Sequence, residues 1–295
     1  MKDDATSGPG PLEKAAAGCP GTLAVCVPGA LGLNEDVVLP LASTGKVLLL
    51  AALAQDVAAG VVDPDEPVPL LEEDYASGSG LLTGLSPRVW TAGDLALLIA
   101  AVSDNTATNA LLRRLGLGRV DACAAALGLA RTRIHDKIRE PRLPEHPPAF
   151  ATGTARELAG LMRSLAYGRE PWQRLLVGWM AHNTDRALVP ALLAHEPEDR
   201  EPPAVLPYAA GVWVANKTGT DAGTRADVGV IAGARWEGYA VLAHGPAGRE
   251  HALVRAIRRA GLAVARTVLP RGGGGPWDEA AGRQWQDCEG DGNNQ

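Results

Sequence analysis

The sequence of 295 residues has little of several residue types: one phenylalanine, four cysteines, seven serines, and five lysines against 23 arginines. With so few aromatic side chains, the core has to be built from Leu, Val and Ala. The cysteines (Cys19, Cys26, Cys123 and Cys288) form no C-x-x-C pair and fit no zinc-binding spacing. We therefore expect free thiols, buried in the manner of small apolar residues.

Blocks of positive charge and long apolar runs are also lacking. The net charge is −6 and there is no basic block, so nucleic acid is not expected as a partner. No stretch comes near the roughly 18 apolar residues of a transmembrane helix. Residues 1–11 hold two acids and no apolar run, unlike a secretory signal. We expect a cytoplasmic monomer without membrane contact; a trimmed precursor stays an open alternative.

Several hydrolase signatures are missing as well. The six histidines form no pair at metal-binding spacing, and the H-E-x-x-H, G-x-S-x-G and Walker A patterns are absent. These absences count against a zinc hydrolase and against an α/β-hydrolase. No metal and no cofactor are expected.

The apolar patterns indicate strands, then a helical block, then strands again. Short β-branched runs at residues 22–27 and 36–39 flank a Pro28-Gly29 turn and predict a hairpin. Helices are predicted at residues 44–59, 91–102, 106–115, 120–127, 154–165, 172–180 and 249–269, and strands at residues 212–217, 227–234 and 239–244. Residues 131–150 are a long, polar, proline-rich loop.

This order predicts an α/β fold of the α+β type. The terminal strands pair into one antiparallel sheet flanked by helices, and a helical subdomain is inserted between them. We expect a flexible lead at residues 1–17, one domain at 18–270, and a disordered, glycine-rich tail at 271–295. Within the domain, residues 18–42 and 206–270 supply the sheet, and residues 43–205 are mainly helical.

The first of three short motifs is Ser43-Thr44-Gly45-Lys46. Ser43 begins a predicted helix, where the helix dipole favours negative charge, and Lys46 follows one turn later on the same face. A desolvated lysine can lose its proton, as arginine cannot, so Lys46 can serve as base for the Ser43 hydroxyl. Taken alone, the pair is better explained as an N-cap serine and a surface lysine.

The second motif, Ser103-Asp104-Asn105, interrupts an apolar helix. We predict that Ser103 passes a proton to the leaving group, that Asn105 holds a substrate amide carbonyl, and that Asp104 braces the loop. The alternative is a turn of small polar residues without a chemical role.

The third motif, Lys217-Thr218-Gly219-Thr220, follows a predicted strand. Gly219 permits close approach of a ligand to the backbone. The N–H groups of Thr220 and Ser43 can form an oxyanion hole. Lys217 is expected to attract a substrate carboxylate and to support the Ser103 hydroxyl, with Thr218 among the substrate-binding residues. Alone, the motif is a β-turn after an edge strand.

Together these residues resemble the penicillin-recognising serine hydrolases, specifically the class A β-lactamase-like branch. Residues 103–109 (SDNTATN) match that branch's usual string, residues 152–165 resemble the helix after its omega loop, and residues 213–219 resemble its strand into K-[ST]-G. The resemblance covers residues 20–268. It implies acyl transfer through a serine ester, without a cofactor.

The omega loop of that class carries E-P-x-L-N, in which the Glu activates the deacylating water and the Asn helps to hold it. Here the string is Glu140-Pro141-Arg142-Leu143-Pro144, so the resemblance implies a catalytic Glu140 but no amide at Pro144. Arg225 resembles the basic residue that neutralises a substrate carboxylate. The alternatives are an exposed Glu on a charged loop and one of many surface arginines.

The sequence thus predicts a β-lactamase-like serine hydrolase. It forms an acyl-enzyme on Ser43 with a small amide, lactam or ester that bears a carboxylate, and releases the acyl group to water. Two alternatives stay open. One is an intracellular amidase, esterase or transacylase for a non-lactam small molecule. The other is a non-catalytic binder or sensor that is acylated without turnover.

Overall fold

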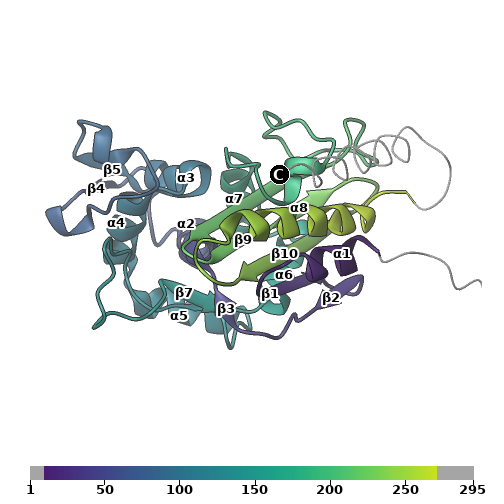
Figure 1. The fold of residues 1–295 in the computed structure, drawn as a ribbon. Helices are drawn as coiled ribbons and strands as arrows, with labels where there is room; N and C mark the ends of the chain where they lie inside the picture. Colours follow the sequence, from purple (N-terminus) through teal and green to yellow (C-terminus); the bar gives the residue numbers. More distant parts are fainter. Residues whose placement is uncertain (1–9, 271–295) are drawn as a thin grey trace, which may run out of the picture.

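A five-stranded antiparallel sheet forms the centre of the computed structural model, which describes residues 10–270. The strand order is β2-β1-β10-β9-β8 (Figure 1). The strands are β1 (Thr22–Val27), β2 (Leu31–Leu33), β8 (Trp213–Asp221), β9 (Thr224–Ala232) and β10 (Trp236–His244). Strands from the two ends of the sequence meet in one sheet, which confirms the predicted fold class.

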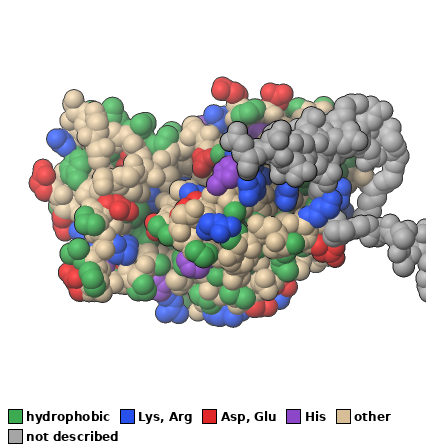
Figure 2. All heavy atoms as spheres, in the orientation of Figure 1, with side chains coloured by type: hydrophobic (Ala, Val, Ile, Leu, Met, Phe, Trp, Pro, Cys, Tyr) green, Lys and Arg blue, Asp and Glu red, His purple; other side chains and the backbone are tan. Residues whose placement is uncertain are grey.

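Both faces of this sheet are buried, because side chains alternate between two cores along each strand. In β9, Val228 and Val230 belong to one core and Ile231 to the other. Helices α1 (Pro11–Ala17) and α8 (Glu250–Arg266) cover the face of Ile231, while α6 (Ala155–Tyr167) and the helical block cover the opposite face. On the side shown in Figure 2, charged groups of both signs and hydrophobic side chains are interspersed over the surface.

The helical block extends to the left of the sheet in Figure 1. It contains α2 (Lys46–Ala58), α3 (Ala92–Val102), α4 (Asn105–Leu115), α5 (Leu117–Ala126) and α7 (Pro171–Ala181), with α2 packed against the other four. Two small sheets join it: β3 (Leu39–Pro40), β7 (Ala151–Gly153) and β6 (Arg133–Ile134) form one, and β4 (Pro67–Pro69) and β5 (Val89–Thr91) the other. The 3-10 helices are η1 (Ala42–Gly45), η2 (Glu72–Asp74), η3 (Leu82–Gly84) and η4 (Val189–Leu192).

The prediction of a flexible lead at residues 1–17 is wrong for its second half, which forms α1. Pro11 occupies the first helical position, and the Glu13 carboxylate accepts the Gly10 N–H at 2.9 Å. Leu12 and Ala15 pack into the core beneath α8. A helix of seven residues depends on such packing for stability and is too short to show a periodic pattern. Residues 1–9 and the predicted tail at 271–295 lie outside the described residues.

The predicted hairpin partner of β1 at residues 36–39 is also wrong, because β2 takes that place. Asn34 has a φ of 47°, and its side chain donates to the Leu23 carbonyl at 2.9 Å, which turns the chain away from the sheet. Val37 and Val38 are then 41% and 45% exposed, and Leu39 begins β3 in a different sheet. Val37 and Val38 are β-branched, as is typical of strands, but they pair with no other strand.

The prediction of buried free thiols is confirmed for Cys26 and Cys123, while Cys19 is free but half-buried. Burial, assisted by a hydrogen bond to Glu35, raises the pKa of Cys26 to about 12. Cys288 lies outside the described residues. Between residues 10 and 270, no helix is long and apolar enough to cross a membrane, and no three His, Cys, Asp or Glu side chains are grouped to hold a metal ion.

The close contact between α6 and β10 generates a stability prediction. A Cβ added to Gly238 would overlap the backbone of Met162 and Arg163 in α6. Because backbone cannot rotate away, Gly238→Ala should lower the free energy of unfolding by about 3 kcal/mol. Gly160→Ala, also on α6 but with nothing within 4 Å of the added Cβ, should instead raise it by up to about 1 kcal/mol. Urea unfolding followed by circular dichroism compares the two, and equal midpoints would contradict this packing.

Candidate active site

Ser43 lies in η1, a 3-10 turn that runs directly into α2. Strand β7 holds this turn in place. The Leu41 N–H donates to the Ala151 carbonyl at 3.0 Å, and Gly45 packs so closely against Ala151 that a side chain at position 45 would not fit. Ala42 has a φ of 46°, which is unfavourable for a residue with a side chain. Ser43 is thereby held half-buried in the wall of a cavity of about 670 Å³.

Lys46 is fully buried one turn after Ser43. Its Nζ lies 2.6 Å from the Ser103 carbonyl, 2.7 Å from Asn105 Oδ1 and 3.2 Å from Ser103 Oγ. Burial lowers the pKa of Lys46 well below its ordinary value, the positive charge of Lys217 lowers it further, and Asp104 opposes both. A neutral amine has two N–H groups, which satisfy the two oxygens that can only accept. Its lone pair is then free to accept a proton from a hydroxyl.

Ser103 places one hydroxyl between two buried amines. It ends α3 in the left-handed conformation, with φ 57° and ψ 37°. Its Oγ lies 3.2 Å from Lys46 Nζ and 3.0 Å from Lys217 Nζ. The structure thus joins the first motif to the second and the second to the third, through residues that are far apart in the sequence.

Lys217 is fully buried in β8, and its Nζ also donates to the Thr218 carbonyl at 2.9 Å. Burial lowers its pKa to about 8, while the carboxylates of Asp185 and Asp227 limit the fall. The pKa of Lys46 is lowered further than that of Lys217. Lys46 therefore loses its proton first, which leaves a neutral amine beside a protonated one.

Asp104 makes three hydrogen bonds to backbone and none to a reacting group. Its Oδ2 accepts the N–H groups of Leu81 at 2.6 Å and Leu82 at 2.9 Å, and its Oδ1 accepts that of Ala107 at 2.8 Å. It thus caps α4 and fixes the neighbouring loop, as the sequence predicts.

Asn105 connects the second motif to the loop at residues 77–80, for which the sequence predicts no role. Its Nδ2 donates to the Ser77 carbonyl at 2.7 Å, and its N–H donates to the Ser79 carbonyl at 3.0 Å. Gly78 and Ser79 line the cavity together with Asn105 and Ser43. The available signal was the string at residues 77–80 (SGSG), which holds two of only seven serines.

Gly219 makes a close contact that the sequence did not predict. A Cβ at this position would lie 2.5 Å from the Leu41 carbonyl, 2.9 Å from the Thr44 nitrogen and 3.2 Å from the Ser43 nitrogen. The missing side chain therefore allows β8 to approach η1 closely, and the approach of a ligand to the Gly219 backbone stays a prediction. The contact between β8 and η1 brings the start of the Thr220-Asp221 segment, which also lines the cavity, beside the turn that holds Ser43.

Arg225 lies on β9 directly opposite Thr220, but it is not among the described residues that line the cavity. Its Nη1 donates to the carbonyls of Asp221 and Thr224 at 2.8 and 2.7 Å. The guanidinium therefore steadies the β8–β9 turn at the edge of the cavity. Its carboxylate-binding role stays a prediction.

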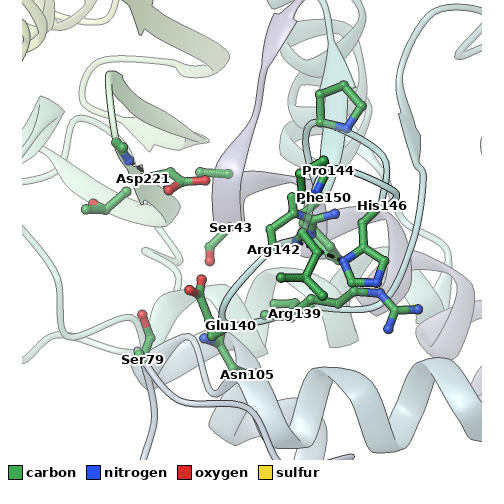
Figure 3. Close-up of a pocket in the computed structure, with 17 residues that line it drawn as sticks. Ser43, Ser79, Asn105, Arg139, Glu140, Arg142, Pro144, His146, Phe150 and Asp221 are labelled. Atoms are coloured by element: carbon green, nitrogen blue, oxygen red, sulfur yellow. Dashed lines mark hydrogen bonds between the residues drawn. The ribbon is translucent and has the colours of Figure 1, made fainter. Parts of the chain in front are cut away.

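The loop at residues 131–150 forms another wall of the cavity. Asn109, the last residue of the 103–109 string, fixes this loop: it donates to the Ile138 carbonyl at 2.9 Å and accepts the Ile138 N–H at 2.7 Å. Two residues later, Glu140 is exposed, and its carboxylate points towards Ser43 in Figure 3. Glu140 has no hydrogen bond or ion pair within residues 10–270, and Pro144 lines the same cavity.

A comparison with known protein families shows which family the chain belongs to. The model of the beta-lactamase enzyme family matches residues 20–268. The chain belongs to this family. The family resemblance that the three motifs indicate is therefore confirmed, over the range expected from the sequence.

Among curated proteins, the chain is similar to the beta-lactamases CARB-3 and PSE-4 of Pseudomonas aeruginosa, with 30% and 29% identity over 156 residues. These alignments cover 51% of the chain and 54% of each relative, so the match spans about half the length of those beta-lactamases.

Solved beta-lactamase structures share the fold. The beta-lactamase from Sphaerobacter thermophilus DSM 20745 has a TM-score of 0.74 at 26% identity, with 87% of this chain and 94% of that one covered. A mutant of PBP-A, solved as an acyl-enzyme complex with penicillin G, has a TM-score of 0.72 at 23% identity, with the same coverage. The latter similarity concerns the fold alone.

The contact between β8 and η1 generates a prediction. Gly219→Ala should push β8 away from the turn of Ser43 and separate the N–H groups of Thr220 and Ser43. Loss of one such donor typically costs about 100-fold or more in rate. The measurement is the rate at which Ser43 is labelled by a fluorescent penicillin, with Gly118→Ala, an open position on α5, as control. Labelling at the rate of the control would contradict the role of this contact.

Proposed function

We propose that the chain is a serine hydrolase of the β-lactamase type, which forms an acyl-enzyme on Ser43 and transfers the acyl group to water. The observation that carries the proposal is the Ser103 hydroxyl, which lies within hydrogen-bond distance of both Lys46 and Lys217. Lys46 also contacts Asn105, which lines the cavity together with Ser43. The chain is similar to the beta-lactamase CARB-3 and to the beta-lactamase from Sphaerobacter thermophilus, and this similarity supports a lactam as substrate.

In the proposed acylation, the neutral amine of Lys46 takes the proton of the Ser43 hydroxyl, directly or with help from Glu140. Ser43 Oγ then bonds to the substrate carbonyl carbon, and the N–H groups of Ser43 and Thr220 hold the developing oxyanion. Ser103 returns a proton to the leaving nitrogen as the carbon–nitrogen bond breaks. Because Ser103 contacts both amines, the proton can reach it from Lys46.

The proposed substrate is a small molecule with a carboxylate next to the reacting amide. Lys217 supplies the buried positive charge for that carboxylate, with Thr218 at its side and Arg225 at the edge of the cavity. Asn105 already uses its Oδ1 for Lys46 and one side-chain N–H for Ser77. Its second N–H remains for the substrate amide carbonyl.

The direct test is covalent labelling of Ser43. Incubation with a chromogenic lactam should give turnover, and intact-protein mass spectrometry should show an adduct on Ser43. Ser43→Ala should abolish both and leave the fold intact, because Ser43 is only half-buried and its hydroxyl caps no helix, so its loss should change the free energy of unfolding by about 0.5 kcal/mol or less. Labelling of the Ala variant at the wild-type rate would refute the nucleophile.

The two lysine pKa values predict the pH dependence of acylation. The lowered pKa of Lys46 favours the neutral base, and Lys217 has to stay protonated to attract a carboxylate. Acylation by a carboxylate-bearing lactam should therefore fall as the pH rises above about 8. Lys217→Arg should remove this fall, because a guanidinium stays protonated. A fall that persists unchanged in the arginine variant would assign it to a different group.

The Glu140 loop predicts slow deacylation. A water needs a base and fixed hydrogen-bond partners within about 3 Å to attack the ester. Glu140 offers the carboxylate, but the ring of Pro144 replaces the amide that the omega loop of class A enzymes supplies. We expect classical penicillins to acylate Ser43 and to accumulate as acyl-enzyme in a burst. Glu140→Ala should lengthen the lifetime of the adduct, and Pro144→Asn should shorten it.

Time-resolved intact-protein mass spectrometry distinguishes the outcomes. Burst-free turnover that survives Glu140→Ala would show that the loop is scaffolding and that Lys46 activates the water. A permanent adduct without any turnover would favour a sensor that is acylated once. A complete lack of adducts and turnover would exclude penicillins as ligands.

A further inference from the structure

Lys217 is a buried cation without a carboxylate in direct contact. Its Nζ contacts two neutral oxygens, Ser103 Oγ at 3.0 Å and the Thr218 carbonyl at 2.9 Å. It forms no ion pair with any of residues 10–270. A protonated amine has three N–H groups, so one of them remains for a substrate. Because a lone charge is costly to bury, other groups in the fold have to stabilise it.

One such group lies behind the strand that carries Lys217. Asp227 is fully buried in β9, directly opposite Thr218 of β8. Side chains alternate along a strand, so Asp227 shares the face covered by α8 with Tyr239 (Figure 1). Lys217 lies opposite Val228, on the face of the helical block. The strands therefore separate the two charges, and Asp227 leaves the amine unoccupied.

Three neutral donors hold the Asp227 carboxylate. Its Oδ1 accepts from Asn216 Nδ2 at 2.9 Å and from the Tyr239 hydroxyl at 3.0 Å, and its Oδ2 accepts the Val189 N–H at 2.9 Å. Burial raises the pKa of Asp227 to about 7, although these hydrogen bonds oppose the rise. Since the pKa of Lys217 is about 8, Asp227 is charged over the pH range in which Lys217 titrates.

A second carboxylate, Asp185, is joined to β8 through two amides. Asn183 Nδ2 donates to Asn216 Oδ1 at 2.9 Å and to the Asp185 carbonyl at 3.0 Å, and Asn183 Oδ1 accepts the Asp185 N–H at 3.1 Å. Asn216 directly precedes Lys217, so the amides hold the Asp185 turn against this strand. Among the carboxylates, Asp185 raises the pKa of Lys217 most. One of its oxygens accepts the Ala187 N–H at 3.0 Å.

The charges around Lys217 balance without direct contact. The second cation of this region, Arg186, donates to Asn216 Oδ1 at 2.6 Å rather than to a carboxylate. Lys46 faces Lys217 across the Ser103 hydroxyl, and its lowered pKa favours the neutral amine. Two cations are thus balanced by two carboxylates. A carboxylate in contact with Lys217 would also stabilise its charge, but it would occupy the N–H that a substrate needs.

We propose that Asp185 and Asp227 are positioning residues that keep Lys217 charged from a distance, so that its free N–H stays available to a substrate carboxylate. This inference deepens the proposed function, because it rests on Lys217 as the group that binds this carboxylate. Neither acid is among the described residues that line the cavity of Ser43. Both therefore affect substrate binding without touching the substrate.

The direct test is a titration of Lys217 followed by nuclear magnetic resonance of isotope-labelled lysine side chains. The chain has only five lysines, and Lys217→Arg identifies the signal of Lys217. In the wild-type protein this signal should titrate near pH 8. Asp227→Asn should lower the midpoint by about one pH unit, because one opposite charge is lost. Asp185→Asn should lower it by at least as much.

Asp56→Asn is the matched control, because it also removes a buried carboxylate, at the far end of α2 from Lys46. It should lower the free energy of unfolding, as Asp227→Asn does, but leave the Lys217 midpoint unchanged. Asp185 is only half-buried, so Asp185→Asn keeps the test available if Asp227→Asn does not fold. An unchanged midpoint in the folded variants, or an equal shift in Asp56→Asn, would overturn the proposal.

Acylation kinetics connect this charge to the substrate. With benzylpenicillin at pH 8, Asp227→Asn should raise the concentration for half-maximal acylation about fivefold, because fewer Lys217 amines are protonated. The maximal rate should change little. At pH 6 the variant and the wild-type protein should agree, since Lys217 is protonated in both. If the midpoint falls but no penicillin acylates Ser43, the role of the two acids stands and only the lactam chemistry is refuted.

Discussion

The site depends on the burial of two lysine amines against one serine hydroxyl. Each amine alone would be costly to bury as a cation. Together they cannot both stay charged at low cost, so Lys46, whose pKa is lowered further, gives up its proton and Lys217 keeps its own. The Ser103 hydroxyl suits this asymmetry, because it can accept from one amine and donate to the other. The proposed proton transfer thus follows from the desolvation of the two amines.

The rest of the fold holds Lys46, Ser103 and Lys217 in contact. Lys46 comes from the central helix α2, Ser103 from the end of α3, and Lys217 from the edge strand β8. Two backbone features bring these elements together: the left-handed Ser103, and Gly219, whose missing side chain lets β8 touch η1. The strain at Ser103 is tolerated because Asp104, directly after it, is held by three backbone N–H groups.

The 131–150 loop supports the site from a different side than the three motifs. Asn109 and the Asp136–Arg139 pair fix its backbone, so Glu140 is held in a defined wall of the cavity. In the proposed reaction, Pro144 cannot supply a side-chain amide to hold a water on this wall. Turnover would then depend on this loop, whereas acylation would depend on the three motifs.

The sequence by itself determined the chemical parts and the order of elements. Scarce lysines at fixed distances from scarce serines pointed to Ser43, Lys46 and Lys217, and the strand–helix–strand order gave the sheet. The tertiary structure decided what depends on how segments pack and pair: α1 beneath α8, the place of β2 beside β1, and the contact of Gly219 with η1. Composition and local periodicity describe what one segment prefers, whereas burial, and with it every shifted pKa, depends on which other segment covers it.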